Sequence, residues 1–150
     1  MPGPGTAFLG GPVLTGTRAD QSDFGVAVLT QRGTLTHNGT TVVSSTFLLP
    51  LGSVLVDVLA DTTTAWNSGT TDVLSVGTAA AGTQYASGID VTSAARVRPT
   101  FTGAQLLAMQ NVVNGGTVVA TVTPTGTASA GITVVTLEYA QTVQLNVGTS

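Results

Sequence analysis

The sequence has no cysteine and no lysine, and charged and aromatic residues are scarce. Without cysteine, the chain can form no disulfide framework, thiolate metal site or cysteine nucleophile. Its 4 arginines and 7 acidic residues make up 7% of the 150 residues, compared with roughly 25% in an ordinary globular domain. Binding to a phosphate backbone requires several Lys or Arg at one site. With a net charge of −3, we therefore expect no nucleic-acid partner.

Long apolar runs are also missing. The longest stretches, such as Phe47–Leu51, are far below the ~18 residues that suggest a membrane span. The N-terminus has neither the positive region nor the apolar region of a secretory signal. We expect no membrane partner and a protein that is made in a bacterial cytoplasm.

Threonine is abundant, with 28 copies. Together with serine, asparagine and glutamine, it predicts a neutral surface rich in hydrogen-bonding groups, which suits packing against other proteins. At 150 residues the chain fits one domain with a single core.

Residues 1–24 differ from the rest, because Met1–Gly16 holds 3 of the 6 prolines and 5 of the 19 glycines. Such a composition disfavours helix and central strand, and we interpret residues 1–24 as an extended N-terminal arm before a domain at 25–150. Ordering ~20 residues costs some 20–40 kcal/mol. The large apolar side chains that could offset this cost against neighbouring subunits are Phe8, Leu9, Val13 and Leu14. A disordered tail and an arm folded back on its own domain are the alternatives.

From Gly25 onward, turn residues divide the chain into short strand-like segments. Strands are expected from Gly25 and then, in order, at Val42–Leu49, Ser53–Thr62, Asp72–Val76, Gln84–Val91, Arg96–Phe101, Thr117–Thr123, Ile132–Tyr139 and Val143–Val147. Short strands at this spacing are typical of a sandwich or barrel. We predict an all-β, antiparallel, jelly-roll-like sandwich.

Three local patterns sharpen this prediction. Asn38-Gly39 predicts a hairpin turn. Within Ser53–Thr62, alternation predicts a core face and an opposite face; the former would carry Val54, Val56, Val58 and Ala60, and the latter Leu55, Asp57, Leu59 and Asp61. Thr102 and Gln105 form a capping-box pattern that predicts one short helix near 103–110.

Catalytic chemistry finds little support. The single histidine, His37, lies beside the predicted turn without a nucleophile or an orienting carboxylate among its sequence neighbours. Asp57 and Asp61 share a strand face, but at about 13 Å apart they are too distant for the paired carboxylates of a glycosidase. No metal-binding loop or nucleotide motif occurs. We expect no enzyme activity, no catalytic residues, no metal and no cofactor.

Three further residues are candidates for an interface. Trp66 is either a core side chain or an interface anchor, because tryptophan is enriched at binding hot spots. Arg96 and Arg98 lie on one strand face, where they either contact acidic residues of a neighbouring molecule or a phosphate, or pair within the chain with Asp90 or Asp72.

Four runs carry a resemblance to a known family: Leu55–Thr70, Asp72–Thr78, Tyr85–Val91 and Val134–Tyr139. Their strand and turn punctuation resembles small β-sandwich virion proteins of tailed phages and prophages, which decorate or cement the head. The resemblance covers about residues 40–140 and implies no active site.

The resemblance implies a structural virion protein on the capsid surface, assembled in the bacterial host cytoplasm. Its partners would be the major capsid protein and other copies of itself, as a trimer or another homo-oligomer. One alternative is a tail- or fibre-associated phage protein. The other is a carbohydrate-binding module with Trp66, Tyr85 and Tyr139 as stacking aromatics.

Overall fold

The computed structural model describes residues 24–50, 52–110, 112 and 116–144. The elements, in chain order, are β1 (Phe24–Thr36), β2 (Val43–Leu48), β3 (Ser53–Thr64), β4 (Asp72–Gly77), β5 (Ala86–Asp90), β6 (Arg96–Val97), α2 (Gly103–Met109), β7 (Thr117–Pro124) and β8 (Ile132–Gln144). The prediction of an all-β sandwich with one short helix is therefore confirmed.

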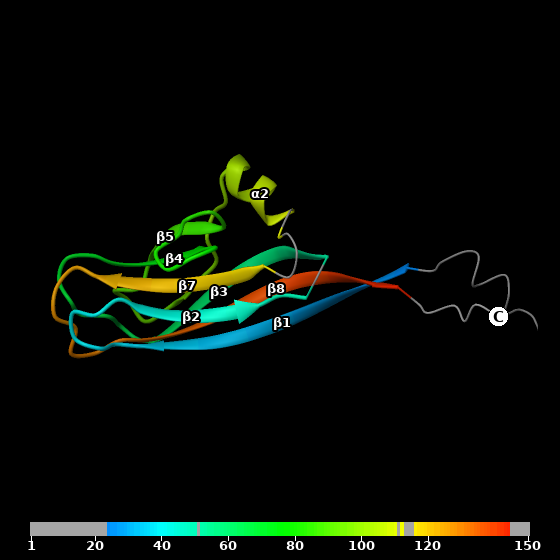
Figure 1. Cartoon of the computed structure of the whole chain (residues 1–150). Coiled ribbons are helices and arrows are strands. Elements are labelled where there is room, and N and C mark those ends of the chain that lie inside the picture. The colour runs from blue at the N-terminus through cyan, green and yellow to red at the C-terminus, as the bar shows by residue number, and fades with distance from the viewer. Residues whose placement is uncertain (1–23, 51, 111, 113–115, 145–150) are drawn as a thin grey trace, which may run out of the picture. The chain divides into compact units, whose positions relative to one another are not determined.

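The strands form two antiparallel sheets with the orders β1-β8-β3-β6 and β2-β7-β4-β5 (Figure 1). Successive strands alternate between the sheets except at β4 and β5, which pair as neighbours. This is the strand order of a jelly roll, in which two Greek keys form a double-sheet sandwich. Most hydrogen-bonded neighbours are thus distant in sequence, such as β2 with β7 and β3 with β8.

The core lies between the two sheets, because each strand turns alternate side chains inward. Both sheets contribute buried residues: Leu35, Leu55, Val58, Ala60, Val135 and Leu137 from the first, and Phe47, Leu74, Val76, Ile89, Val118, Ala120 and Val122 from the second. A domain of this size can bury enough apolar surface to be stable without cross-links.

The predicted faces of β3 are right for one half of the strand and wrong for the other. Val58 and Ala60 are fully buried as expected, but Leu55 is also buried while Val56 is 43% exposed. The ladder between β3 and β8 shifts register between Leu55 and Asp57. An extra residue at this bulge exchanges the two faces of the strand, and simple alternation cannot anticipate it.

The hairpin predicted at Asn38-Gly39 is wrong. A turn does occur there, since the Thr41 N–H donates to the Asn38 carbonyl over 3.0 Å and Gly39 has a φ of +61°. However, β1 and β2 lie in different sheets. The turn leads the chain across the sandwich, and Gly39 instead forms a bridge with Ala128.

The predicted strand bounds differ most from the observed ones at β6 and β8. The strand expected at Arg96–Phe101 is limited to Arg96–Val97. The segments expected at Ile132–Tyr139 and Val143–Val147 are joined in one strand, Ile132–Gln144, as far as the described residues extend.

The predicted capping box at α2 is confirmed. The Gln105 N–H donates to Thr102 Oγ1, while the Thr102 N–H donates to Gln105 Oε1. The Gln105 amide also donates to the Thr83 carbonyl, which fastens this short helix to the loop before β5. Figure 1 shows α2 beside the β4–β5 pair.

The chain divides into two compact units, Met1–Ala27 with Thr142–Ser150, and Val28–Gln141. In the first unit the structure describes the start of β1 and the end of β8. The second unit contains the other strands, the helix and the core. The predicted arm at 1–24, with its candidate interface residues Phe8, Leu9, Val13 and Leu14, lies outside the described residues except for Phe24.

Candidate functional site

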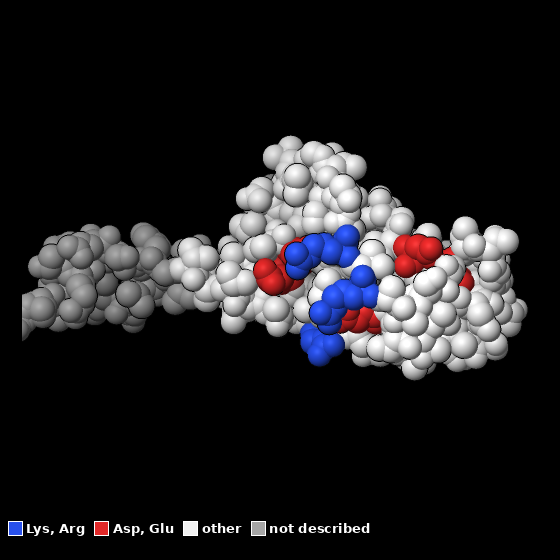
Figure 2. Space-filling view, turned by 180° about the vertical axis from the view of Figure 1, so that it is seen from behind, with Lys and Arg blue, Asp and Glu red and all other residues white. Residues whose placement is uncertain are grey.

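The charged residues of the second unit gather on one surface, the outer face of the β1-β8-β3-β6 sheet. Six of the eight charged residues that the structure describes belong to it: Arg32, Asp57, Asp61, Arg96, Arg98 and Glu138. The other two are Asp72 and Asp90. Figure 2 shows the arginines beside the acidic side chains, with uncharged surface around them. We call this set of six the charged face.

Both arginines after β5 pair with aspartates of β3. Arg96 Nε lies 2.5 Å from Asp61 Oδ1 and its Nη2 lies 3.0 Å from Asp61 Oδ2, which makes a two-point contact. Arg98 Nε lies 2.7 Å from Asp57 Oδ2. The arginine side chains are 71% and 67% exposed, and both aspartates are 16% exposed. The two pairs hold the short β6 against β3.

The partners expected for these arginines, Asp90 and Asp72, are therefore wrong. The ladder places Arg96 opposite Asp61, and Arg98 reaches Asp57 diagonally along the same face. That pairing of β6 with β3 joins segments about 35 residues apart, and local spacing carries no signal for it.

The charges also change the acidity of Asp61. The hydrogen bond from Arg96 lowers the pKa of this carboxyl, the positive charges of Arg96 and Arg32 act in the same direction, and partial desolvation opposes them. In return, the hydrogen bond to Asp61 raises the pKa of Arg96. Asp61 thus stays ionised and paired, which suits a structural contact and not a proton-transfer group.

Trp66 lies in the core and is only 2% exposed. Its Nε1–H donates to Thr133 Oγ1 over 2.9 Å, and Gly131 leaves room for the indole, because a Cβ there would lie 2.7 Å from Trp66 Cγ. Of the two interpretations of Trp66, the structure agrees with a core residue. An interface anchor would have to present its ring to a partner.

The other two acidic residues that the structure describes, Asp72 and Asp90, form hydrogen bonds that stabilise turns. Asp72 is fully buried and accepts hydrogen bonds from the backbone N–H and the hydroxyl of Ser68. Asp90 accepts from the side chain and backbone of Thr92, and these bonds lower the pKa of its carboxyl. Both arrangements stabilise chain reversals next to β4 and β5.

His37 lies just after β1, and its backbone N–H donates to the Gly131 carbonyl over 2.9 Å. Its Nδ1 is buried and has no hydrogen-bond partner among the described residues. Within those residues, no group of three or more His, Cys, Asp or Glu side chains is placed to hold a metal ion. No signal in the sequence points to a role for His37 beyond the turn.

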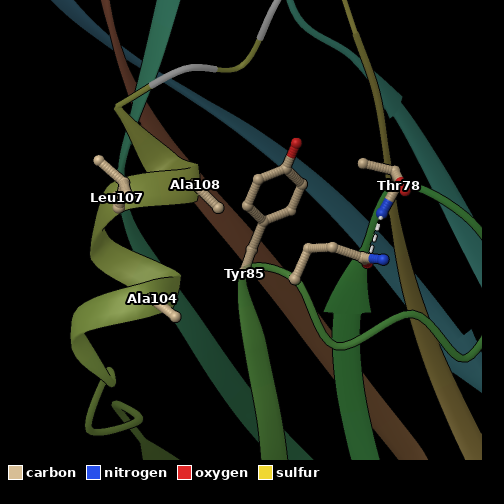
Figure 3. A pocket seen from close by; sticks show the side chains of 6 residues that line it. Thr78, Tyr85, Ala104, Leu107 and Ala108 are labelled. Atoms are coloured by element: carbon tan, nitrogen blue, oxygen red, sulfur yellow. Dashed lines mark hydrogen bonds between the residues drawn. The ribbon is translucent and has the colours of Figure 1, made fainter.

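A cleft of about 560 Å³ lies between α2 and the start of β5. Leu107, Ala104 and Ala108 line one wall, and Tyr85 and Thr78 line the other (Figure 3). Tyr85 is 5% exposed, and burial raises the pKa of its phenol. The Thr78 N–H donates to Gln84 Oε1 over 3.2 Å. Sequence reasoning did not identify this cleft, because loop packing creates it.

The aromatic residues considered for carbohydrate stacking are all buried. Trp66, Tyr85 and Tyr139 are 2%, 5% and 6% exposed. Sugar stacking needs an accessible ring face, so these three side chains provide no stacking platform in this structure. Phe47 is buried as well, and Phe101 packs against the core.

Among the described residues, no helix is both long and apolar enough to cross a bilayer. In comparisons with known proteins, no family model, no curated protein and no solved structure matched this chain.

Proposed function

We propose that this protein is a structural virion component that decorates or cements the capsid of a tailed phage. It would bind major capsid subunits and neighbouring copies of itself. The observation that carries the proposal is that the four runs resembling small phage virion proteins contribute strands of one jelly roll, namely β3, β4, β5 and β8. Fold alone does not imply function, so the chemistry of the surface must support the same conclusion.

The surface chemistry supports a binding role. The arginines of β6 and its continuation already pair with carboxylates, and the acids beside β4 and β5 stabilise turns. Elsewhere the exposed surface is dominated by hydroxyl-bearing and small side chains. Such a surface suits broad contacts that are individually weak and become strong when a symmetric shell repeats them.

The N-terminal residues have a specific part in this proposal. Residues 1–23 would lie along a neighbouring subunit and add backbone hydrogen bonds to a sheet edge, a recognised mode of peptide binding. Phe8, Leu9, Val13 and Leu14 would supply the apolar contacts.

The test is binding of the purified protein to expanded, empty heads of the phage that encodes it. We expect saturable binding with a fixed number of copies per capsid subunit, and labelled imaging should place the protein on the head. Absence of binding, or a label confined to the tail or fibres, would overturn the proposal.

Two variants separate the contribution of residues 1–23. Deleting them leaves β1 intact and should lower occupancy on the head. Replacing Phe8, Leu9, Val13 and Leu14 with serine keeps the length of the segment, and should lower occupancy nearly as much. Unchanged occupancy in both variants would refute the role of this segment while leaving capsid binding by the sandwich intact.

A further inference from the structure

The edges of the two sheets differ in how well they are protected. The outermost strands are β1 and β6 in one sheet, and β2 and β5 in the other. A free strand edge presents unpaired N–H and C=O groups, and proteins usually guard it with shortness, bulges, proline or charge. Among the residues that the structure describes, three of these edges have such protection and β1 does not.

The protected edges are short. β6 has two residues, the first of which is Arg96, and Arg98 follows directly after it. β5 has five residues, a glycine with a φ of +68° at Gly88, and an irregular register with β4. β2 has six residues, and the carbonyl of its last residue, Leu48, already accepts from the Gln31 side chain over 2.8 Å.

β1 is different, because it has thirteen residues, no proline and one charged side chain, Arg32. Within the Val28–Gln141 unit it exposes apolar side chains, with Val28 at 59% and Leu29 at 42%. The adjacent edge strand adds Leu48 at 66%. The Gln31–Leu48 hydrogen bond shows that these two edges lie side by side. Exposed apolar groups and a strand edge with no partner among the described strands therefore coincide on one side of the sandwich.

We infer that this side binds a second copy of the chain, through antiparallel pairing of β1 with the partner's β1 about a two-fold axis at Thr30. The inference deepens the proposed function and rests on it only insofar as a virion component must bind neighbouring copies. Three arguments favour the second copy as the occupant.

The first is length. The other edges of the chain offer two, five or six residues, whereas β1 matches itself over its whole length, and Thr30 is its middle residue. Such a contact also uses the same edge on both copies, so that it closes at a dimer and leaves no β1 edge free.

The second is charge. An axis at Thr30 places Arg32 of each copy opposite Val28 of the other, and the two Arg32 side chains do not face each other. An axis at Arg32 would set like charges directly opposite, which is unfavourable. The third is the low charge of the whole chain, 7% of residues, which keeps repulsion between copies small.

The pairing geometry makes the test sensitive to the sign of a charge. Val28→Lys would place a second cation opposite the partner's Arg32, twice in the dimer, and should weaken dimerisation about tenfold. Val28→Glu would place a carboxylate there and should strengthen dimerisation by a similar factor. Since Val28 is 59% exposed, both changes are tolerated by the isolated fold.

The measurement is light scattering after size exclusion over a range of concentrations, with melting curves to show that each variant is folded. Val73→Lys and Val73→Glu, at a 38% exposed valine of β4, are the matched controls and should leave the dimer unchanged. A wild-type chain that is monomeric at every concentration would overturn the inference, as would Val28→Lys and Val28→Glu acting in the same direction.

A covalent test uses the absence of native cysteine. Thr30→Cys should form a disulfide-linked dimer under mild oxidation, because the two-fold axis brings the two copies of this position within disulfide range. Ser93→Cys, at an exposed position between β5 and β6, should remain monomeric. Equal cross-linking at both positions would refute the register.

These outcomes are separable from the capsid experiment. A dimer that follows the predicted charge pattern but does not bind heads would contradict the proposed function and keep this inference. Head binding by a chain that stays monomeric would do the reverse.

Discussion

The outer faces of the two sheets of the sandwich carry different kinds of side chain. The β1-β8-β3-β6 sheet carries the charged face, with exposed arginines that pair with aspartates. The outer face of the β2-β7-β4-β5 sheet carries one charged side chain among the described residues of its strands, Asp90 at the end of β5, which lies opposite Val73. On this second sheet a ladder of hydroxyls from Ser44, Thr121 and Ser75 crosses three strands.

The second face is partly covered by the chain itself. Thr121 is fully buried and Ser75 is 9% exposed, although alternation turns both away from the core. The cover is the loop between β4 and β5, from which the Ala81 N–H donates to Thr121 Oγ1 over 3.0 Å. Ala81 has a φ of +61°, and Gly77 and Gly82 allow the loop to approach the strand closely.

The difference between the two faces predicts which substitutions lower the stability of the fold most. Exposed ion pairs contribute little to stability because water and salt screen them. Changes to buried hydroxyls and closely packed backbone lower the free energy of unfolding more. A buried polar group that loses its hydrogen-bond partner cannot form a replacement hydrogen bond with water. Three changes test this comparison.

The largest effect is expected from Gly77→Ala. An added Cβ would lie 2.5 Å and 2.7 Å from the backbone C and Cα of Gly82, so the covering loop has to move. Overpacking of this kind costs about 1–3 kcal/mol, and the free energy of unfolding from denaturant titration measures it. Gly103→Ala is the control, because no neighbouring atom lies within 4 Å of its added Cβ. Equal stability of the two variants would show that the loop does not pack as described.

An intermediate effect is expected from Thr121→Val. The change preserves shape but removes the oxygen that bonds Ala81 and Ser44, which should cost about 1–2 kcal/mol. Proteolysis of the loop at residues 78–84 should also become faster. Thr46→Val, at an exposed position of the neighbouring β2, should change neither. A loss at Thr46 as large as that at Thr121 would contradict the assigned hydroxyl network.

The smallest effect at neutral pH is expected from Asp61→Asn on the charged face. Because the folded-state pKa of Asp61 is lowered, chiefly by Arg96, its contribution is present above the ordinary carboxyl range near about 4. It is lost as the pH falls through the lowered value.

The wild-type Tm should therefore fall more steeply on acidification than that of Asp61→Asn. Raising the salt to ~1 M, where the Debye length is about 3 Å, should shrink the difference between them at pH 7. An unchanged difference in salt would mean that Asp61 acts through packing and not through its charge.

Much of the local structure follows from neighbouring residues. The capping box at Thr102 and Gln105 predicted α2 within one residue of its observed end, because both of its hydrogen bonds form within one helical turn. Turn residues predicted the bounds of β2, β4 and β7 to within a residue or two, because glycine, proline and asparagine mark the ends of short strands in the local sequence.

The contacts at the surface could not be predicted from neighbouring residues in the same way. The bulge that turns Leu55 inward depends on pairing with β8. The partners of Arg96 and Arg98 depend on the neighbour that β6 acquires. The cleft at Tyr85 depends on where α2 docks. In each case the decisive contact joins residues from distant parts of the chain.

By itself, then, the sequence determined the class of fold, the short helix and the scarcity of charge and thiol chemistry, because composition and short-range periodicity are enough for these properties. Tertiary structure alone decided the jelly-roll order, the gathering of the charges on one sheet and the exposure of the β1 edge. The physical reason is the topology: nearly every ladder pairs strands that are not consecutive, so the environment of a side chain is set by a segment that its own sequence neighbours do not specify.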